Sequence, residues 1–203
     1  MTNVKLVVVG DGAIGKTCLL VVFAKGTFPE QYVPTVFENY TKTFTHPDHG
    51  EVNLALWDTA GQEEFDKLRP LSYPDTDIVL ICFSLVDEQS LGNTRDKWLP
   101  EVRDHLSDAP IFLVGLKADL RDEMPENAVS TEKGEALVGD IGATQYWEVS
   151  AKAHTNVDEL FNAAVSAVME KRKSDSQATE AAQAAQSTPA AAEKSGGGCC
   201  TLL

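Results

Sequence analysis

The sequence has few cysteines and no long apolar run. Its 203 residues include only four cysteines, at positions 18, 82, 199 and 200. No apolar stretch reaches the roughly 18 residues needed to span a bilayer, and no secretory leader is expected. Because no histidine lies at metal-ligand spacing from a cysteine, no structural zinc site is expected. These features favour a reducing, intracellular setting.

Positive charge is also scarce. The chain has 17 Lys and Arg residues against 31 Asp and Glu residues, a formal net charge of −14 at pH 7. This balance leaves no broad basic surface for nucleic acid, so nucleic acid is not an expected partner. An acidic protein is also repelled by anionic lipid unless something else holds it at a membrane.

One glycine-rich stretch carries the strongest functional signal. Gly10–Thr17 reads GDGAIGKT and lies between the apolar run Leu6–Val9 and the helix-compatible segment Cys18–Lys25. The pattern G-x-x-x-x-G-K-[ST] in this position is typical of a phosphate-binding P-loop, in which backbone N–H groups and a helix dipole converge on a polyphosphate. Lys16 would supply positive charge there, and Thr17 a hydroxyl for Mg²⁺. The alternative is an ordinary glycine-rich turn between a strand and a helix.

Strand-like and helix-like segments alternate along the chain. Apolar or alternating segments lie near 4–9, 36–45, 51–57, 77–83, 111–116 and 145–149, and amphipathic helical patterns at 16–25, 88–106, 130–140 and 155–172. The turn His46–Gly50 should join an antiparallel pair and leave its two histidines solvated, whereas the later strands should be parallel. We therefore expect an α/β fold with a six-stranded, mostly parallel sheet flanked by about five helices.

The composition changes towards the end of the chain. From residue 174 onward the sequence is rich in Ala, Ser, Gln and Glu and contains no aromatic residue, so it cannot build a core. We expect one domain over 1–173 and a flexible tail over 174–203. The alternative for the alanine-rich part is a transient helix.

A second motif follows the segment that ends at Trp57. Asp58–Glu63 reads DTAGQE, which places the Asp58 carboxylate at the carboxyl end of a strand, where parallel sheets bind ligands. Gly61 would let its N–H approach a terminal phosphate, and Gln62 can both donate to and accept from an attacking water. By itself this motif is also compatible with a polar turn.

Together these motifs resemble those of the Ras superfamily of small GTPases. The match covers about residues 4–172 and rests on Gly10–Thr17, Asp58–Glu63, Lys117–Asp119 and Ser150–Lys152, which occur in the family's order. Similarity to the Rho/Rac branch rests on Cys18–Leu20, Trp57, Tyr32–Tyr40 and Leu68–Tyr73.

The resemblance implies a P-loop GTPase that binds GTP or GDP with Mg²⁺ and hydrolyses GTP slowly, with Gln62 and Lys16 as catalytic residues. The implied magnesium ligands are Thr17, Thr35 and Asp58, the last through water. Two mobile segments, switch I (roughly 28–40) and switch II (about 59–75), would respond to the terminal phosphate. The implied nucleotide-binding residues are Gly12, Ala13, Gly15, Lys16, Thr17, Cys18, Phe28, Tyr32, Pro34, Thr35, Gly61, Lys117, Asp119, Leu120, Ser150, Ala151 and Lys152.

The resemblance also implies how the base is chosen. Asp119 would accept from two adjacent donors on guanine, the Lys117 stem would lie across the base, and Ala151 would donate a backbone N–H, so GTP is preferred over ATP. Phe28 would cover the guanine or ribose edge; the alternative is a core aromatic at a helix end.

Two departures from the family pattern matter. The usual Asn, or Thr in the Rac-like branch, is Leu116 here, which removes a bracing hydrogen bond and predicts faster nucleotide exchange. The segment Leu120–Ser130 is too short for the helical insert of the Rho branch, so partners that read the insert should not bind.

The resemblance implies exchange factors, activating proteins, dissociation inhibitors and effectors as partners of a monomeric protein, with actin regulation as the expected role. Arg69 is expected to serve the switch II surface. Effectors would read Val36, Phe37, Glu38, Tyr40, Leu68 and Leu71.

The last four residues, Cys200-Thr201-Leu202-Leu203, fit a C-a-a-X prenylation signal and predict geranylgeranylation of Cys200. Because one lipid binds membrane only reversibly, palmitoylation of Cys199 is the expected supplement. The cluster Lys171–Lys173 either assists at the membrane or simply closes a helix. The expected location is the cytoplasmic face of a membrane, such as the plasma membrane, and the cytosol.

Two other functions are weighed against a GTPase switch. A metabolic P-loop kinase or ATPase would need a lid with arginines and an acceptor pocket, and Lys117 and Asp119 argue against ATP. A nucleotide-loaded binding module with negligible hydrolysis would be expected to lack Gln62 or to carry a larger residue at Gly12.

Overall fold

A six-stranded sheet forms the centre of the structure, a computed structural model that describes residues 1–31 and 35–186, with side chains described up to residue 180. The strands lie in the order β2-β3-β1-β4-β5-β6. Only β2 and β3 pair antiparallel among these described strands, while the other neighbours pair parallel. Their bounds are β1 (Thr2–Gly10), β2 (Phe37–His46), β3 (Gly50–Thr59), β4 (Ile78–Ser84), β5 (Ile111–Leu116) and β6 (Gln145–Glu148). The predicted six-stranded, mostly parallel sheet is confirmed.

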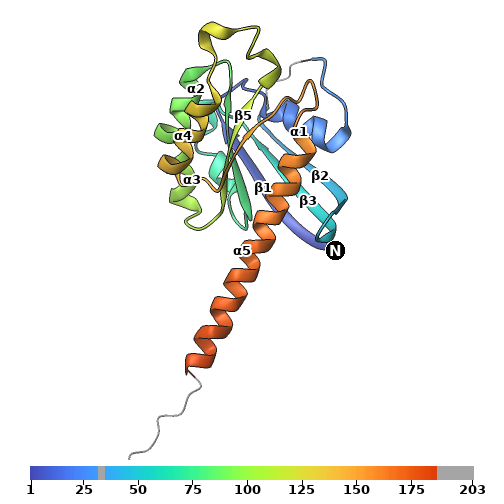
Figure 1. Cartoon of the computed structure of the whole chain (residues 1–203), viewed down its shortest axis with the longest axis vertical. Coiled ribbons are helices and arrows are strands. Elements are labelled where there is room, and N and C mark those ends of the chain that lie inside the picture. The colour runs from blue at the N-terminus through green and yellow to red at the C-terminus, as the bar shows by residue number, and fades with distance from the viewer. Residues whose placement is uncertain (32–34, 187–203) are drawn as a thin grey trace, which may run out of the picture. The chain divides into compact units, whose positions relative to one another are not determined.

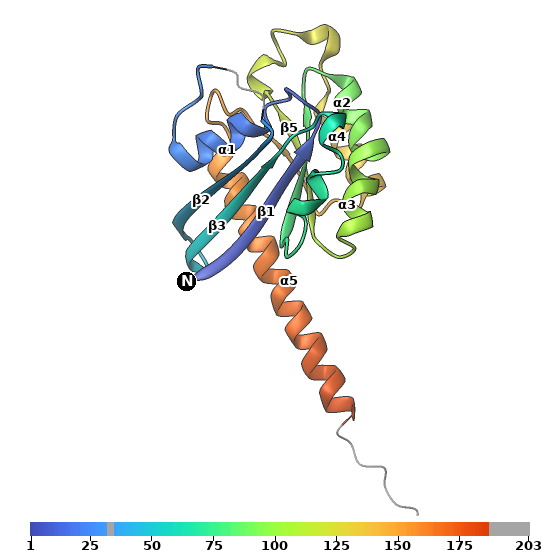
Figure 2. The same cartoon turned by 180° about the vertical axis from the view of Figure 1, so that it is seen from behind.

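Helices cover both faces of this sheet (Figure 1, Figure 2). Their bounds are α1 (Lys16–Lys25), α2 (Glu88–Asn93), α3 (Leu99–His105), α4 (Thr131–Ile141) and α5 (Val157–Gln186). Helix α1 and the first part of α5 pack on one face, where Leu20 and Phe161 join a core with side chains of β1 and β3. Helices α3 and α4 cover the other face with two further apolar clusters.

The central strand β1 divides its side chains between these two layers. Val4, Leu6 and Val8 face α1 and α5, whereas Val7 and Val9 face α3. Because successive side chains of a strand point to opposite faces, the continuous apolar run of β1 buries both of its sides. This double burial fixes the end of β1, and therefore the start of the glycine-rich loop that follows it.

The predicted helix over 88–106 is divided in the structure. Helix α2 ends at Asn93, a π turn occupies Thr94–Trp98, and α3 starts at Leu99. Pro100 lies at the start of α3 and has no N–H to donate to the preceding turn, which accounts for the wider π turn before it.

The chain forms two compact units, Met1–Met169 and Glu170–Leu203. In the second unit the backbone stays helical as far as Gln186, beyond residue 174 where the sequence predicted a flexible tail. The alanine-rich composition explains this helix, since alanine has the highest helix propensity. The division into a domain and a tail stays a prediction.

The prediction that His46 is a solvated turn residue is wrong. His46 is buried at the end of β2, where its Nδ1 accepts from the Asp48 backbone N–H at 3.1 Å. Its Nε2 lies 3.1 Å from the carbonyl oxygen of Asn162 on α5, so the ring links the β2–β3 turn to that helix. Within the described part of the chain, no helix is long and apolar enough to cross a membrane.

Candidate functional site

The glycine-rich loop runs from the end of β1 to the start of α1. Gly10 has φ +144°, and a Cβ there would lie 2.7 Å from Cδ1 of Ile14 and closer still to the Cys82 carbonyl oxygen. Only glycine fits this turn without strain. The loop then curls over the first residues of α1, whose backbone N–H groups have no partner within the helix and are suited to bind an anion.

Lys16 is held inside this loop. Its side chain is nearly buried, and its Nζ donates to the carbonyl oxygens of Gly10 and Asp11, both at 2.7 Å. Burial lowers the pKa of Lys16 to about 8, although the nearby Asp58 favours the charged form. An ammonium group has three donors, so one N–H stays available for a phosphate oxygen.

Gly61 is pressed against the same loop. A Cβ on Gly61 would lie 2.5 Å from the Gly12 nitrogen and closer still to the backbone of Gly10 and Asp11. The carbonyl oxygen of the preceding residue, Ala60, accepts from the Arg69 Nε at 3.0 Å. Because C=O and N–H point in opposite directions across a trans peptide, the Gly61 N–H points away from Arg69.

A magnesium ion fits the group formed by Asp58, Thr17 and Thr35. Both carboxylate oxygens of Asp58 are buried and have no hydrogen-bond partner among the described residues. The hydroxyls of Thr17 and Thr35 lie 2.6 Å apart, so a residue of α1 and a residue of the segment before β2 meet at one point. Burial raises the pKa of Asp58 to about 6, although the hydroxyl of Thr17 and the charge of Lys16 favour the charged form. Oxygen donors of this kind are those that Mg²⁺ prefers, and the ion would neutralise the carboxylate.

Gln62 also has an unused polar atom. Its Oε1 is buried without a hydrogen-bond partner among the described residues. The side chain lies next to Gly12, where a Cβ would be 3.5 Å from the Gln62 Cδ. The amide oxygen can therefore accept a hydrogen bond from one water molecule placed between it and the loop.

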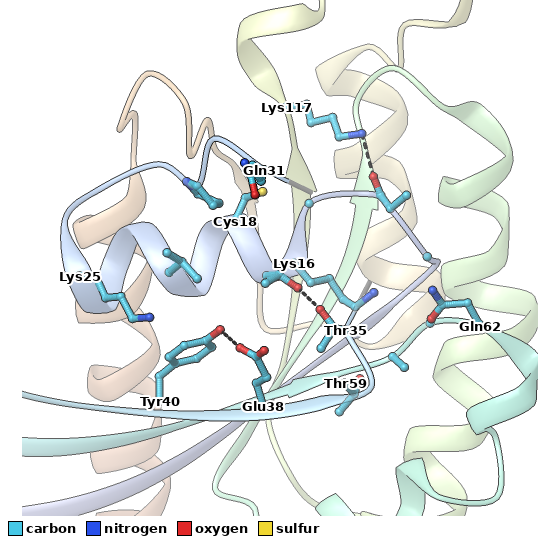
Figure 3. A pocket seen from close by; sticks show the side chains of 18 residues that line it. Lys16, Cys18, Lys25, Gln31, Thr35, Glu38, Tyr40, Thr59, Gln62 and Lys117 are labelled. Atoms are coloured by element: carbon cyan, nitrogen blue, oxygen red, sulfur yellow. Dashed lines mark hydrogen bonds between the residues drawn. The ribbon is translucent and has the colours of Figure 1, made fainter. Parts of the chain in front are cut away.

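Apart from Asp58, which is not among the lining residues, these groups line one hollow of about 300 Å³ (Figure 3). Lys16, Thr35 and Gln62 point towards the same cavity in this view. Thr35 contributes from the segment before β2, and Lys117 from the loop after β5. The predicted site residues that line this hollow are Gly12, Ala13, Gly15, Lys16, Thr17, Cys18, Thr35, Glu38, Tyr40, Gly61, Gln62 and Lys117.

A second hollow of about 320 Å³ adjoins the first and shares Gly15, Cys18 and Lys117 with it. The other residues around it are Phe28, Leu116, Asp119, Leu120, Ala151 and Lys152. Phe28 is 44% exposed, so it is not the core aromatic of the alternative interpretation.

Two loops meet at this second hollow. The Ser150 hydroxyl is buried and donates to the Asp119 carboxylate at 2.6 Å, so Ser150 orients Asp119 and does not line the cavity itself. Lys117 Nζ donates to the Ala13 carbonyl oxygen at 3.0 Å, and its aliphatic stem lies near Gly15, which lines the same hollow. Ala118 N–H donates to the Val149 carbonyl oxygen at 3.1 Å and completes the junction.

The predicted effector residues fall into two groups. Val36, Phe37, Leu68 and Leu71 are exposed apolar side chains around a third hollow of about 220 Å³. Glu38 and Tyr40 instead lie on the phosphate side, where the Tyr40 hydroxyl donates to Glu38. Four further predicted residues, Tyr32, Pro34, Cys199 and Cys200, lie outside the described part of the chain.

Arg69, which was expected to serve the switch II surface, lines the third hollow there but is not exposed. Its side chain is fully buried and stacks over the Trp98 ring, with the guanidinium carbon 4.6 Å from the ring centroid. It pairs with Glu101 at 2.5 Å and with Asp66 at 2.8 Å. The sequence contained no local signal for this burial, because all the partners except Asp66 come from distant segments or from the backbone.

Trp98 and Asn93 were also not identified from the sequence. The Trp98 indole N–H donates to one oxygen of the Asp11 carboxylate at 2.7 Å, and the Asn93 side chain donates to the other at 2.6 Å. The end of α2 and the π turn therefore both support the glycine-rich loop through Asp11. Asp11 lies at one of the variable positions of the loop motif, so the motif alone does not point to this contact.

Comparison with known proteins gives a consistent result. A sequence profile of the Ras family matches residues 5–170. GTP-binding protein rho1 of Schizosaccharomyces pombe is 53% identical over 178 residues, which cover 83% of this chain and 88% of that protein. Rho-related protein racE of Dictyostelium discoideum is 47% identical over 195 residues, covering 93% and 87%, and GTP-binding protein RHO1 of Candida albicans is 52% identical over 181 residues, covering 83% and 91%. The chain therefore belongs to the Ras family of small GTPases, in its Rho branch.

Proposed function

We propose that the protein is a GTP-dependent switch whose two hollows hold one guanine nucleotide. The observation that carries the proposal is that the phosphate-side hollow and the base-side hollow share Gly15, Cys18 and Lys117. One hollow presents backbone N–H groups and Lys16, as a polyphosphate requires. The other presents the Asp119 carboxylate, as the two adjacent donors of guanine require.

Hydrolysis in this proposal is an in-line attack of water on the terminal phosphate. The unpaired Oε1 of Gln62 accepts a hydrogen bond from the attacking water and orients it. Lys16, with its free N–H, and the Gly61 N–H stabilise the charge that develops on the phosphate oxygens. Magnesium, which would be held by Thr17 and Thr35 directly and by Asp58 through water, would supply further positive charge for the same oxygens.

The intrinsic reaction should be slow. No arginine is among the residues that line the described part of the phosphate-side hollow, and the guanidinium of Arg69 is fully buried in its own network. A GTPase without its own arginine turns over at roughly 10⁻⁴–10⁻³ s⁻¹, as Ras does, and an activating protein that inserts one raises the rate about 10⁵-fold. The proposal therefore includes an activating protein as a partner.

The switch would be read at the third hollow. Val36 and Phe37 belong to switch I, and Leu68 and Leu71 to switch II, so this exposed apolar surface changes when either segment moves. Effectors, exchange factors and dissociation inhibitors are the proposed partners, with regulation of actin as the proposed outcome. Attachment to a membrane through lipids on Cys200 and Cys199 remains a prediction from the sequence.

A single-turnover assay of phosphate release tests this function. Purified protein loaded with GTP should release phosphate slowly, and a Rho-type activating protein should accelerate the release by several orders of magnitude. GTP that stays intact with the activating protein present would favour a binding module without hydrolysis. Equal retention of ATP and GTP would contradict the assignment of Asp119.

A further inference from the structure

The loop that carries Asp119 lacks one of its family supports. Residue 116 is Leu, which is buried and apolar and cannot donate the bracing hydrogen bond of the usual Asn. The loop Leu120–Ser130 contains a short 3₁₀ turn, η5 (Pro125–Asn127), and no longer helix within its described residues. Besides the Ser150–Asp119 and Ala118–Val149 hydrogen bonds, a further link would therefore help to hold Asp119 in position against the loop that carries Ser150.

Arg121 provides a link of this kind on the outer side of the base-side hollow. It directly follows Leu120, and one terminal nitrogen of its guanidinium donates to Glu148. The other terminal nitrogen donates to the Thr131 hydroxyl at 3.3 Å, at the start of α4. Glu148 ends β6, two residues before Ser150, so the Arg121–Glu148 pair joins the same two loops that the Ser150–Asp119 bond joins.

The pair is not an ordinary surface ion pair. The side chains of Arg121 and Glu148 are only 26% and 20% exposed. Nε of Arg121 is buried without a hydrogen-bond partner among the described residues, so the guanidinium depends on its two terminal nitrogens. Burial alone would raise the pKa of Glu148, but the hydrogen bonds from Arg121 and Tyr146 lower it below its usual value.

Tyr146 keeps Glu148 in place from the other side. Its hydroxyl donates to the same Oε1 at 2.7 Å. The Tyr146 ring stacks with Phe83, at 6.3 Å between centroids, and lies against Gly134 of α4. A Cβ on Gly134 would lie 2.8 Å from Cε2 of this ring, so only glycine leaves room for the tyrosine. The acceptor that Arg121 needs is therefore fixed by packing against α4.

We propose that Arg121 and Glu148 form a base-loop clamp, a pair of positioning residues that sets the spacing between Asp119 and Ser150 and thereby the selectivity for guanine. The clamp replaces the support that Leu116 cannot give. This inference rests on the proposed guanine site. Neither clamp residue is among those lining the base-side hollow, so the clamp acts through Asp119 and not by touching the base.

The test compares the release of two nucleotides from the full-length protein. Inosine diphosphate lacks the exocyclic amino group of GDP, which is one of the two donors that Asp119 would accept. Dissociation rates of fluorescent GDP and inosine diphosphate are measured for the native protein, Arg121→Met and Glu148→Gln. Arg95→Met is the matched control, because Arg95 forms an exposed pair with Asp96 away from both hollows.

In both clamp variants we expect GDP to dissociate about tenfold faster, while inosine diphosphate is released only two- to threefold faster. Discrimination between the two nucleotides would then fall several-fold, whereas Arg95→Met should leave both rates unchanged. Arg121→Lys keeps the charge but not the two-pronged donor, so its dissociation rates should lie between those of the native protein and Arg121→Met. If Arg121→Met does not fold, Arg121→Lys takes its place in the test.

Two results would overturn the clamp. If the clamp variants have the same dissociation rates as Arg95→Met, the Arg121–Glu148 pair does not position the loop. If they release both nucleotides faster by the same factor, the pair has a purely structural role. Failure of the guanine site itself is distinguishable, because the native protein would then release GDP and inosine diphosphate at the same rate.

Discussion

Replacement of Gly61 by alanine tests the contact between switch II and the glycine-rich loop. An added Cβ would lie 2.5 Å from the Gly12 nitrogen and closer to the backbone of Gly10 and Asp11. All of these are backbone atoms, so no flexible side chain can give way. The two segments must therefore separate by about 1 Å to restore ordinary van der Waals contact.

That displacement determines the size of the effect. Lengthening a hydrogen bond of ordinary geometry by about 1 Å effectively breaks it. A hydrogen bond from the Gly61 N–H to a charged phosphate oxygen contributes roughly 1.5–3 kcal/mol. Since about 1.4 kcal/mol corresponds to tenfold in affinity, Gly61→Ala should weaken binding of a non-hydrolysable GTP analogue roughly 10- to 150-fold relative to GDP.

The assay is competitive titration of fluorescent GDP with unlabelled GDP and with the GTP analogue. Gly139→Ala is the control, because a Cβ at that helical position meets no atom within 4 Å. The ratio of the two affinities should change in Gly61→Ala and stay constant in Gly139→Ala. An unchanged ratio in Gly61→Ala would refute the role of the Gly61 N–H at the terminal phosphate.

Three further perturbations follow from the site. Gln62→Leu should leave affinity for GTP nearly unchanged and abolish the hydrolysis stimulated by an activating protein; normal single-turnover rates would contradict its role in orienting water. Burial raises the pKa of Asp58 to about 6, so the free energy of unfolding of the metal-free protein should rise as the pH falls through 6. Mg²⁺ needs the ionised carboxylate and should therefore bind about tenfold more weakly at pH 5 than at pH 7. Asp58→Asn should bind Mg²⁺ weakly at both pH values, and an equally steep pH dependence in that variant would rule out Asp58 as its source. Arg69→Met should lower the free energy of unfolding by roughly 3–5 kcal/mol, because it leaves Glu101 with no guanidinium partner, and a change below 1 kcal/mol in urea denaturation would contradict this reasoning.

The arrangement of the sheet was predictable because each strand carries a local signal. The mainly apolar segments at 77–83 and 111–116 became the buried strands β4 and β5, and the alternating segments on either side of His46–Gly50 became the antiparallel pair β2 and β3. The glycine-rich loop was also readable, since its mechanism depends on residue types at fixed spacing along the chain.

Contacts between segments that are distant in the sequence could not be predicted in the same way. Arg69 and His46 both lie in polar, turn-like stretches, which predict exposure, yet each is buried by partners on other elements such as Glu101 and Asn162. Their burial depends on hydrogen bonds that only the folded chain brings together. The Arg121–Glu148 pair could not be predicted from the sequence for the same reason, because 27 residues separate its members.

The central claim is that the terminal phosphate holds Thr35 and Gly61 in place and that its loss releases them. Hydrogen exchange of the two backbone amides, measured with Mg²⁺ and either GDP or a non-hydrolysable GTP analogue, tests this directly. We expect markedly slower exchange at both amides with the analogue, while the exchange of buried amides of β5 stays the same. Equal exchange at Thr35 and Gly61 with either nucleotide would contradict it.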